Sequence, residues 1–256
     1  MCFDHDSRPP IPPISGGSID SRTIELVSED GTLFMAFEAR AASPTGAAML
    51  VLPDVRGLHG YYEELCLRFA ENGIDALAID YFGRTAAGAD RGPDFDYQPH
   101  VAQLQYATLV QDVSAGMHQL RQAAEPRAAF SVGFCMGGRL SFVLLSRPAL
   151  GLDGAIGFYG WPVGPSRNGT PAPVDLVGEM RGAVLGLFGG ADQGIPPAAV
   201  SAFDMALDAS GIDHQVVSYP RAGHGFFDRK ASEFAAESAD AWQHVLEFVA
   251  ANTPPQ

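Results

Sequence analysis

The chain has 256 residues, of which 46% are hydrophobic and 18% charged, and this length and composition suit one globular domain with a sizeable core. Its formal net charge of -14 gives a field that repels nucleic acid and anionic membrane surfaces, so neither is an expected partner. The three cysteines, at positions 2, 66 and 135, form no C-x-x-C pair, and therefore neither a disulfide framework nor a zinc knuckle is indicated.

The first 20 residues contain four prolines together with Gly, Ser and Asp, a composition that does not form a regular element. We therefore expect residues 1–20 to be an extended arm and residues 21–256 to form the folded domain. The Cys, His and Asp side chains of the arm match no standard metal spacing, and no metal is expected there. The start lacks a basic segment followed by an apolar one, and no apolar run approaches the ~20 residues of a membrane span, so we expect a soluble, cytoplasmic protein.

Two β-rich stretches follow the arm, residues 23–28 and 33–40, and the Glu29-Asp30-Gly31 turn between them predicts a hairpin. Further along the chain, short continuous apolar runs indicate strands buried on both faces, because parallel strands covered by helices have no solvent face. These runs occupy residues 47–53, 74–80, 128–134, 155–160, 183–189 and 214–220.

Helical patterns separate most of these strands, at residues 61–73, 100–124, 137–146, 196–211 and 232–252. The alternation predicts an α/β fold with a mostly parallel sheet of about eight strands and helices on both faces. In such sheets the functional site lies at the carboxyl ends of the strands. Two irregular segments, 82–99 and 161–177, follow strands, and we expect them to rim this site.

The stretch SVGFCMGGRL, residues 131–140, places Cys135 in a sharp turn between a strand and a helix, with glycines at the -2, +2 and +3 positions. This is the layout of a nucleophile elbow, which needs small neighbours and lifts the central side chain above the sheet. A helix N-terminus also stabilises a thiolate through its N–H groups and dipole. The alternative is an inert buried cysteine, but the glycines and the element order favour a nucleophile.

A cysteine nucleophile needs a base and an acid that orients the base, in the chain order nucleophile, acid, histidine. Asp192 follows the strand 183–189, and His224 follows the strand 214–220, so both match this order. Both also come after predicted strands, on the side of the sheet where the elbow is expected. Asp192 could instead cap the helix 196–211, and His224 could be a turn residue. We expect a catalytic pair.

The oxyanion hole needs two backbone donors, one of them from the residue after the nucleophile, which here is Met136. The second comes from the loop after an early strand, which makes Val55 the expected donor. Its neighbour Asp54 would lie close to the thiol of Cys135, where a carboxylate opposes thiolate formation in the empty site. Alternatively, Asp54 caps its own loop.

Aromatic side chains follow several of the predicted strands and could line an apolar acyl or aryl pocket. Aromatic residues at strand ends also often close a core, and the sequence does not separate the two roles. These residues are Phe82, Tyr159, Trp161, Phe226 and Phe227.

With these residues in place, the chain resembles the dienelactone hydrolase family, a minimal α/β-hydrolase without a cap domain. The resemblance covers residues 22–251 and is carried by LPDVRGLHGYYEELCLRFAENG, AIDYFGR, GFCMGG, GGADQGIP and AGHGF. It implies a triad of Cys135, His224 and Asp192 that hydrolyses a small ester or lactone through an acyl-thiol intermediate, without metal or organic cofactor. In characterised members a glutamate holds the resting thiol and is displaced on substrate binding, and Asp54 stands at the matching position. The protein would be a monomer or a homodimer.

Family members that act on dienelactone also bind its carboxylate with two arginines. Arg84 matches the first, although a loop arginine could instead pair with Asp80 or Asp90. The second is expected four residues after the histidine, where this chain has Asp228 followed by Arg229. An aspartate repels a carboxylate, so dienelactone itself is not the expected substrate unless Arg229 reaches the site.

Three functions remain to be compared. The first is a cysteine-dependent hydrolase of the carboxymethylenebutenolidase type. The second keeps the fold as a catalytically silent ligand-binding or regulatory module. The third is thiol redox sensing at Cys135, which requires a resolving cysteine, whereas Cys66 is predicted on the helix 61–73, away from the elbow.

Overall fold

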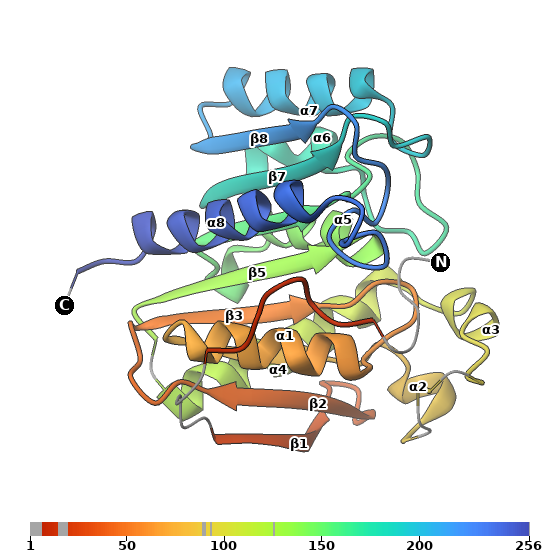
Figure 1. Ribbon diagram of the computed structural model, residues 1–256. Coiled ribbons are helices and arrows are strands. Elements are labelled where there is room, and N and C mark those ends of the chain that lie inside the picture. The colour runs from red at the N-terminus through yellow and green to blue at the C-terminus, as the bar shows by residue number, and fades with distance from the viewer. Residues whose placement is uncertain (1–6, 15–19, 89–90, 93, 125, 256) are drawn as a thin grey trace.

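An eight-stranded sheet runs through the middle of the molecule in the computed structural model, which describes residues 7–14, 20–88, 91–92, 94–124 and 126–255 (Figure 1). The order across the sheet is β1-β2-β4-β3-β5-β6-β7-β8. β1 pairs antiparallel with β2, β2 antiparallel with β4, and the other pairings are parallel. The strands are β1 (Asp20–Val27), β2 (Leu33–Arg40), β3 (Ala47–Leu52), β4 (Ile74–Ile79), β5 (Ala128–Phe134), β6 (Gly154–Phe158), β7 (Ala183–Gly189) and β8 (His214–Tyr219).

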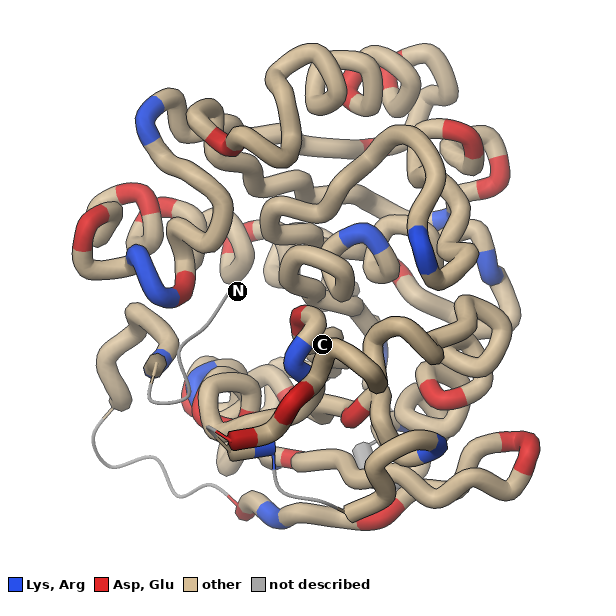
Figure 2. Tube along the Cα trace, turned by 90° about the vertical axis from the view of Figure 1, so that its right-hand side faces the viewer, with Lys and Arg blue, Asp and Glu red and all other residues tan. Residues whose placement is uncertain are grey.

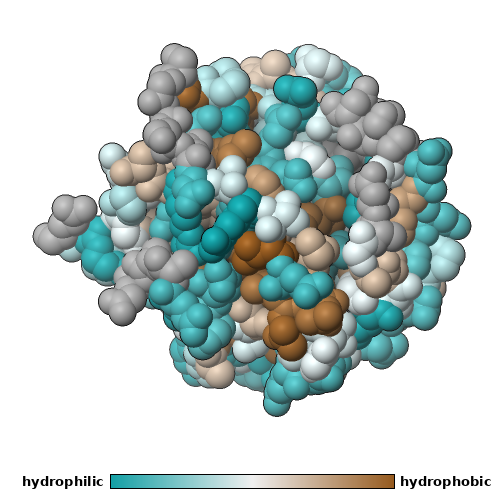
Figure 3. Space-filling model, turned by 90° about the horizontal axis from the view of Figure 1, so that it is seen from below, coloured by the Kyte–Doolittle hydropathy of each residue, from teal (hydrophilic) through white to brown (hydrophobic). Residues whose placement is uncertain are grey.

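The five central strands are buried along their whole length, as their continuous apolar sequences predict. The edge strand β1 differs, because most of its residues are exposed and three of them, Asp20, Arg22 and Glu25, are charged. Charges on an edge strand disfavour pairing with another sheet. Seen from this edge, the surface is mostly hydrophilic, with hydrophobic residues gathered near the centre of the view (Figure 3).

Two layers of helices cover the sheet. α1 (Gly60–Glu71) and α8 (Ala235–Ala251) lie side by side on one face, where Phe69 and Trp242 bring their ring centroids to 4.9 Å (Figure 1). α4 (Tyr106–Ala124), α5 (Met136–Leu144) and α7 (Pro197–Ala209) belong to the other layer. Two glycines of β6 mark the two faces, since a Cβ at Gly154 would meet Phe248 of α8 and one at Gly157 would meet Phe142 of α5.

The prediction of one continuous helix over residues 100–124 is wrong at its start. The structure has the short helix α3 (Gln98–Val101), and the long helix α4 begins only at Tyr106. The reason is that the Tyr106 N–H donates to the carbonyl oxygen of Asn168, 2.9 Å away, so the chain turns toward the segment 161–177 before α4 begins. The two segments expected to be irregular also contain short helices, which are α2 (Gly83–Ala86), α6 (Pro173–Leu176) and the 3-10 turn Val177–Glu179; another such turn is Pro148–Leu150.

The described part of the expected N-terminal arm, residues 7–14, runs across α1. Arg8 pairs with Glu64 at 3.5 Å, and the Ile14 N–H donates to Glu71 Oε2 at 3.1 Å. Residues 1–6, which include the arm's metal-ligating residue types, lie outside the described residues. Within the described chain, no helix is both long and apolar enough to cross a membrane.

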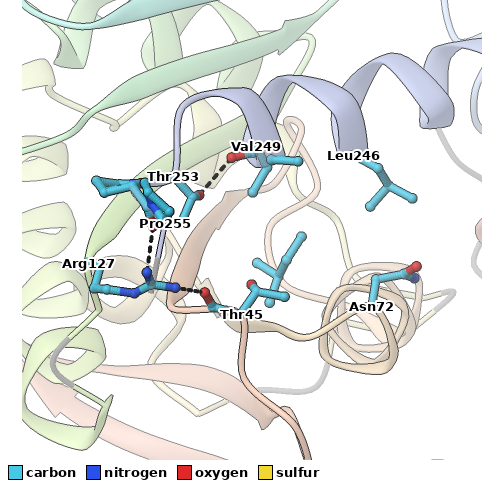
Figure 4. A pocket seen from close by; sticks show the side chains of 10 residues that line it. Thr45, Asn72, Arg127, Leu246, Val249, Thr253 and Pro255 are labelled. Atoms are coloured by element: carbon cyan, nitrogen blue, oxygen red, sulfur yellow. Dashed lines mark hydrogen bonds between the residues drawn. The ribbon is translucent and has the colours of Figure 1, made fainter.

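The two ends of the parallel strands differ in their surroundings. At the amino ends, a cavity of about 330 Å³ lies beside the C-terminal segment (Figure 4). The guanidinium of Arg127 spans it by donating to the carbonyl oxygens of Thr45 and Pro254. Residues of the C-terminal segment thus form part of the wall of this cavity. Figure 2 looks onto the opposite, carboxyl end, where acidic and basic residues are spread without forming one patch of either sign.

Candidate active site

Cys135 occupies the turn between β5 and α5 with φ 54° and ψ -111°, a left-handed conformation that costs a non-glycine residue about 1–3 kcal/mol. Its N–H donates to the carbonyl oxygen of Phe158 at 3.0 Å, which fixes the turn against the end of β6. A Cβ at Gly133 would lie 1.9 Å from the carbonyl oxygen of Gly137, so a glycine is required where the strand passes under the helix. The geometry is that of the predicted elbow.

The first turn of α5 is wedged between two neighbouring strand ends. A Cβ at Gly137 would lie 2.2 Å from the Leu52 carbonyl oxygen at the end of β3, and one at Gly138 would lie 2.7 Å from the Phe158 carbonyl oxygen at the end of β6. Close backbone approach on both sides therefore depends on these glycines. It brings the loop that begins at Pro53 beside the N-terminus of α5.

Asp192 and His224 form the expected pair, with 2.7 Å between Asp192 Oδ2 and His224 Nδ1. The other carboxylate oxygen accepts from the N–H groups of Gly194 at 2.8 Å and Ile195 at 3.2 Å, and the Asp192 side chain is almost fully buried. Burial acts to raise the pKa of Asp192, but the contacts with His224 and the two N–H groups outweigh it and hold that pKa below its usual value. Asp192 thus stays ionised and orients the imidazole.

A cavity of about 570 Å³ opens at this end of the sheet, and both Cys135 and His224 line it. The other lining residues are Val55, Tyr97, Gln98, Val101, Met136, Arg139, Tyr159, Trp161, Pro165, Ser166, Arg167, Asn168, Thr170, Gly194 and Ile195. Most of the wall is apolar, and none of these residues is acidic although the chain carries a net charge of -14. The space is large enough for a small organic molecule beside the thiol.

The two expected oxyanion donors, Val55 and Met136, both line this cavity. Met136 is the first residue of α5, so its N–H belongs to the helix N-terminus and has no intrahelical acceptor. Among the described residues, neither the Val55 nor the Met136 N–H donates a recorded hydrogen bond. The oxyanion role of these two N–H groups stays a prediction.

Asp54 is fully buried and does not line the cavity. Its Oδ1 accepts from the Arg56 N–H at 2.9 Å, which is the loop-capping role left open by the sequence. Burial raises the pKa of the Tyr81 hydroxyl, and the charges of Asp54 and Asp80 raise it further. The regulation of the thiol by Asp54 stays a prediction.

The aromatic residues expected around the site separate into two groups. Tyr159 and Trp161 line the cavity. Phe82, Phe226 and Phe227 are fully buried outside it, where Phe82 packs against Phe95 and His100, and Phe226 against Tyr219 and Tyr159. The structure brings only the first group next to Cys135.

Neither expected arginine lines the cavity. The guanidinium of Arg84 contacts Asp112 at 2.5 Å and Asp30 at 3.0 Å, so it is an ion-paired residue, and the partners are not those suggested by the sequence. Asp80 instead pairs with Arg91 at 2.7 Å, and Asp90 lies outside the described residues. Arg229 is exposed and lines a separate surface hollow that also contains Ser7 and Arg8.

Several lining residues were not singled out from the sequence. Gln98 and Val101 belong to the short α3 and Tyr97 directly precedes it, whereas the lining residues between 165 and 170 belong to the segment that was expected only to rim the site. Arg139 stands out because it lies one helical turn after Cys135, at a position that looks like an ordinary helix residue. Residue patterns alone carry no signal for such placement, because it depends on how loops fold over the strand ends.

Asp228 forms a buried contact behind the imidazole. Its Oδ2 accepts from the Tyr159 hydroxyl at 3.0 Å, and the Tyr159 ring lies 4.8 Å from the His224 ring, centroid to centroid. Burial raises the pKa of Asp228 to about 8, against the opposing effect of its hydrogen bonds from Arg229 N–H and Tyr159, and the charge of Asp54 adds to the increase. Asp228 is not among the residues that line the cavity.

This buried carboxyl group predicts a pH dependence of stability. Between about pH 4 and about pH 8 the folded state keeps a proton on Asp228 that the unfolded state has lost, so the free energy of unfolding falls as pH rises, by at most ~1.4 kcal/mol per pH unit. Asp228→Asn should remove this contribution. Urea unfolding at pH 5.5 and pH 7.5 measures it.

The control for this prediction is Asp213→Asn, which changes an exposed carboxylate. Its free energy of unfolding should change with pH as that of the wild type does, whereas the Asp228→Asn protein should lose less stability between the two pH values. Identical pH slopes for all three proteins would contradict a buried, protonated Asp228.

Cys66 is fully buried in α1, and burial raises the pKa of its thiol far above the ordinary range. A buried, protonated thiol inside a helix is poorly suited to resolve an oxidised Cys135. Cys2 lies outside the described residues. The redox alternative thus gains no support from Cys66.

Comparison with known proteins gives one consistent result. A model of the dienelactone hydrolase family matches residues 35–253. A protein of Salmonella typhimurium named "Putative carboxymethylenebutenolidase" is 28% identical over 239 residues, which is 90% of this chain and 87% of that protein. One of the same name from Methylorubrum extorquens is 30% identical over 238 residues, 88% of this chain and 79% of that protein.

Among solved structures, a protein of Klebsiella pneumoniae described as "Putative Dienelactone Hydrolase" superposes with a TM-score of 0.79 at 26% identity, covering 91% of this chain and 99% of that one. The residues 35–253 that the family model matches contain Cys135, Asp192 and His224.

Proposed function

We propose, from the premise that this chain belongs to the dienelactone hydrolase family, that it hydrolyses a small carboxylic ester or lactone through Cys135, His224 and Asp192. The observation that carries the proposal is the 2.7 Å contact between Asp192 and His224, beside a cavity into which both the imidazole and the strained Cys135 turn open. The relatives named carboxymethylenebutenolidase support the same class of reaction.

In the proposed reaction, His224 takes the proton of the Cys135 thiol, and the sulfur attacks the carbonyl carbon of the substrate. The N–H groups of Met136 and Val55 then donate to the oxygen that becomes negative. Collapse of this intermediate breaks the C–O bond, and the imidazolium gives its proton to the departing alkoxide. For a lactone, the alcohol stays attached to the acyl group.

A water molecule completes the cycle. His224 takes a proton from this water as its oxygen attacks the thioester carbon, and the carbon–sulfur bond then breaks to release the carboxylic acid and regenerate the thiol. Throughout, Asp192 holds Nδ1 of His224, so that Nε2 is the nitrogen that exchanges protons. The chemistry proposed here uses these side chains and no cofactor.

The substrate suggested by the lining is neutral or weakly polar around the acyl group. Tyr159 and Trp161 offer aromatic surface, whereas Arg84 is ion-paired outside the cavity and Asp228 is buried behind Tyr159. Of the two positions that would bind a dienelactone carboxylate, one carries an arginine that pairs with Asp112 and Asp30, and the other carries Asp228. We propose a small aryl or alkyl ester, or a lactone without that carboxylate.

Selective alkylation tests the proposal. Brief treatment with iodoacetamide should modify Cys135, located by peptide mapping, in parallel with loss of aryl-ester hydrolysis, while the buried Cys66 stays unmodified. A protein that hydrolyses no ester or lactone in a broad panel, yet binds such compounds, would instead support the silent binding module. Hydrolysis that survives complete alkylation of Cys135 would contradict the mechanism.

A further inference from the structure

One wall of the cavity is a loop, residues 161–171, which we call the rim loop. Its members that line the cavity are Trp161, Pro165, Ser166, Arg167, Asn168 and Thr170. The rim loop contains no helix or strand of its own. Its shape must therefore be fixed by contacts other than the backbone hydrogen bonds of a helix or sheet. The largest set of such contacts comes from one side chain.

That side chain belongs to Arg139 and is only 5% exposed. Its Nε donates to the Pro171 carbonyl oxygen at 3.1 Å, and Nη1 lies 3.3 Å from the carbonyl oxygens of both Trp161 and Val163. Its Nη2 donates to the carbonyl oxygens of Gly164 at 2.6 Å and Thr170 at 2.9 Å. One guanidinium thus binds five backbone acceptors spread over the whole rim loop.

The chemistry of this contact requires arginine. A guanidinium presents five N–H donors in a rigid plane, so it can serve carbonyls at both ends of a loop, whereas the ammonium of lysine donates from a single point. Burial acts to lower the pKa of Arg139, and the exposed Asp175 is the carboxylate that opposes this. The positive charge is therefore compensated mainly by carbonyl dipoles of the rim loop.

Internal bonds make the rim loop one unit around this cation. The Asn168 side-chain oxygen accepts from the Ser166 hydroxyl at 2.8 Å and from the Thr170 N–H at 3.1 Å. The Asn168 carbonyl oxygen accepts from the Tyr106 N–H at the start of α4. Loss of the Arg139 contacts would consequently remove five of the bonds that hold this unit to the rest of the molecule.

We propose that Arg139 is a positioning residue that holds the rim loop as a wall of the cavity and thereby sets which acyl and alcohol groups fit beside Cys135. The role connects the two parts directly, because Arg139 lies on α5 one turn after the nucleophile. Any displacement of this turn moves both the thiol and the wall. The selectivity part of the proposal rests on the proposed function, whereas the holding of the rim loop does not.

The first test is native proteolysis, which needs no turnover. Arg167 is exposed in the rim loop and is followed by Asn168, so trypsin can cut there when the loop opens. In Arg139→Met, cleavage after Arg167 followed by mass spectrometry should accelerate on the order of tenfold or more, because the open population rises with the loss of five hydrogen bonds. Arg139→Lys should fall between this variant and the wild type.

The matched control is Arg121→Met. Arg121 also ties a helix to a loop through carbonyl oxygens, those of Leu150 and Gly151, but it is not among the cavity residues. Its loss should leave the rate of cleavage after Arg167 unchanged. Equal rates in Arg139→Met and the wild type would overturn the proposal, and so would faster cleavage at arginines throughout the chain, which indicates general unfolding.

The second test compares esters of different size. In Arg139→Lys, kcat/KM for p-nitrophenyl hexanoate should fall several-fold more than kcat/KM for p-nitrophenyl acetate, mainly through a higher KM for the hexanoate, because the longer acyl chain depends on the wall. Proportionate loss for both esters would contradict a selectivity role. If neither the wild type nor any variant hydrolyses either ester, the proposed function fails. The rates of tryptic cleavage after Arg167 still decide whether Arg139 holds the rim loop.

Discussion

Replacing Cys135 by alanine is expected to lower kcat for small aryl esters by at least ~10³-fold, because the nucleophile is removed and only binding and the oxyanion donors remain. The alanine Cβ fits the same left-handed turn that Cys135 adopts at φ 54°. The fold should therefore persist, and the free energy of unfolding should change by no more than ~1 kcal/mol. Steady-state kinetics and urea unfolding measure the two effects.

The control for this variant is Cys66→Ala. That thiol is completely buried in α1, so its removal should destabilise the protein by about 1 kcal/mol and leave kcat unchanged. Cys135→Ala should thus lose activity and keep its stability, whereas Cys66→Ala should lose stability and keep its activity. Undiminished hydrolysis by Cys135→Ala would show that another group is the nucleophile.

Asp192→Asn should lower kcat/KM by ~10³-fold or more with little change in KM, since the imidazole would be held in the wrong tautomer. The asparagine side-chain oxygen can still accept from Gly194 and Ile195, as Oδ1 does now. Its amide nitrogen would then face His224 Nδ1, which must act as an acceptor. Nε2 would carry the proton and could not take one from Cys135.

Asp204→Asn provides a comparison for this variant. Asp204 also lies next to a histidine, His214 at 3.3 Å, but on α7 and β8 away from the cavity. The kcat/KM of the Asp204→Asn protein should equal that of the wild type. An Asp192→Asn protein with full kcat/KM would show that His224 needs no orienting carboxylate in this chain.

The sequence predicted the fold in considerable detail, for reasons visible in the packing. Strands such as β3 and β5 are buried on both faces, so they appear as continuous apolar runs. The glycines around Cys135 are required by backbone contacts below 3 Å, and such requirements leave a clear pattern. The expected positions of Asp192 and His224 also meet in space, because both follow strands whose carboxyl ends meet at one edge.

The cavity wall could not be predicted in the same way. Arg84 lies in a motif of the family, yet two carboxylates, Asp112 and Asp30, contact it, and one of them comes from α4. Arg139 has the appearance of a helix residue, but it binds carbonyls 22 to 32 positions later in the chain. Side-chain partners of this kind depend on loop conformations that no local pattern fixes.

The same limit applies to Asp228, which replaces an expected cation. The sequence showed that it would repel a substrate carboxylate. Only the structure shows that it is 3% exposed, that it accepts from Tyr159, and that it lies behind the His224 ring. The contact between them is Tyr159, which directly follows β6 and adopts a positive φ of 41°.

A covalent acyl-thiol intermediate on Cys135 adds the mass of the acyl group to the protein, and intact-mass spectrometry detects it. After brief mixing with p-nitrophenyl acetate, the wild-type protein should carry one acetyl group on Cys135 that disappears within the turnover time, and Cys135→Ala should carry none. In His224→Ala the adduct should form slowly or persist. Rapid release of nitrophenol without any acetyl adduct on Cys135, or an adduct of equal amount in Cys135→Ala, would contradict the mechanism.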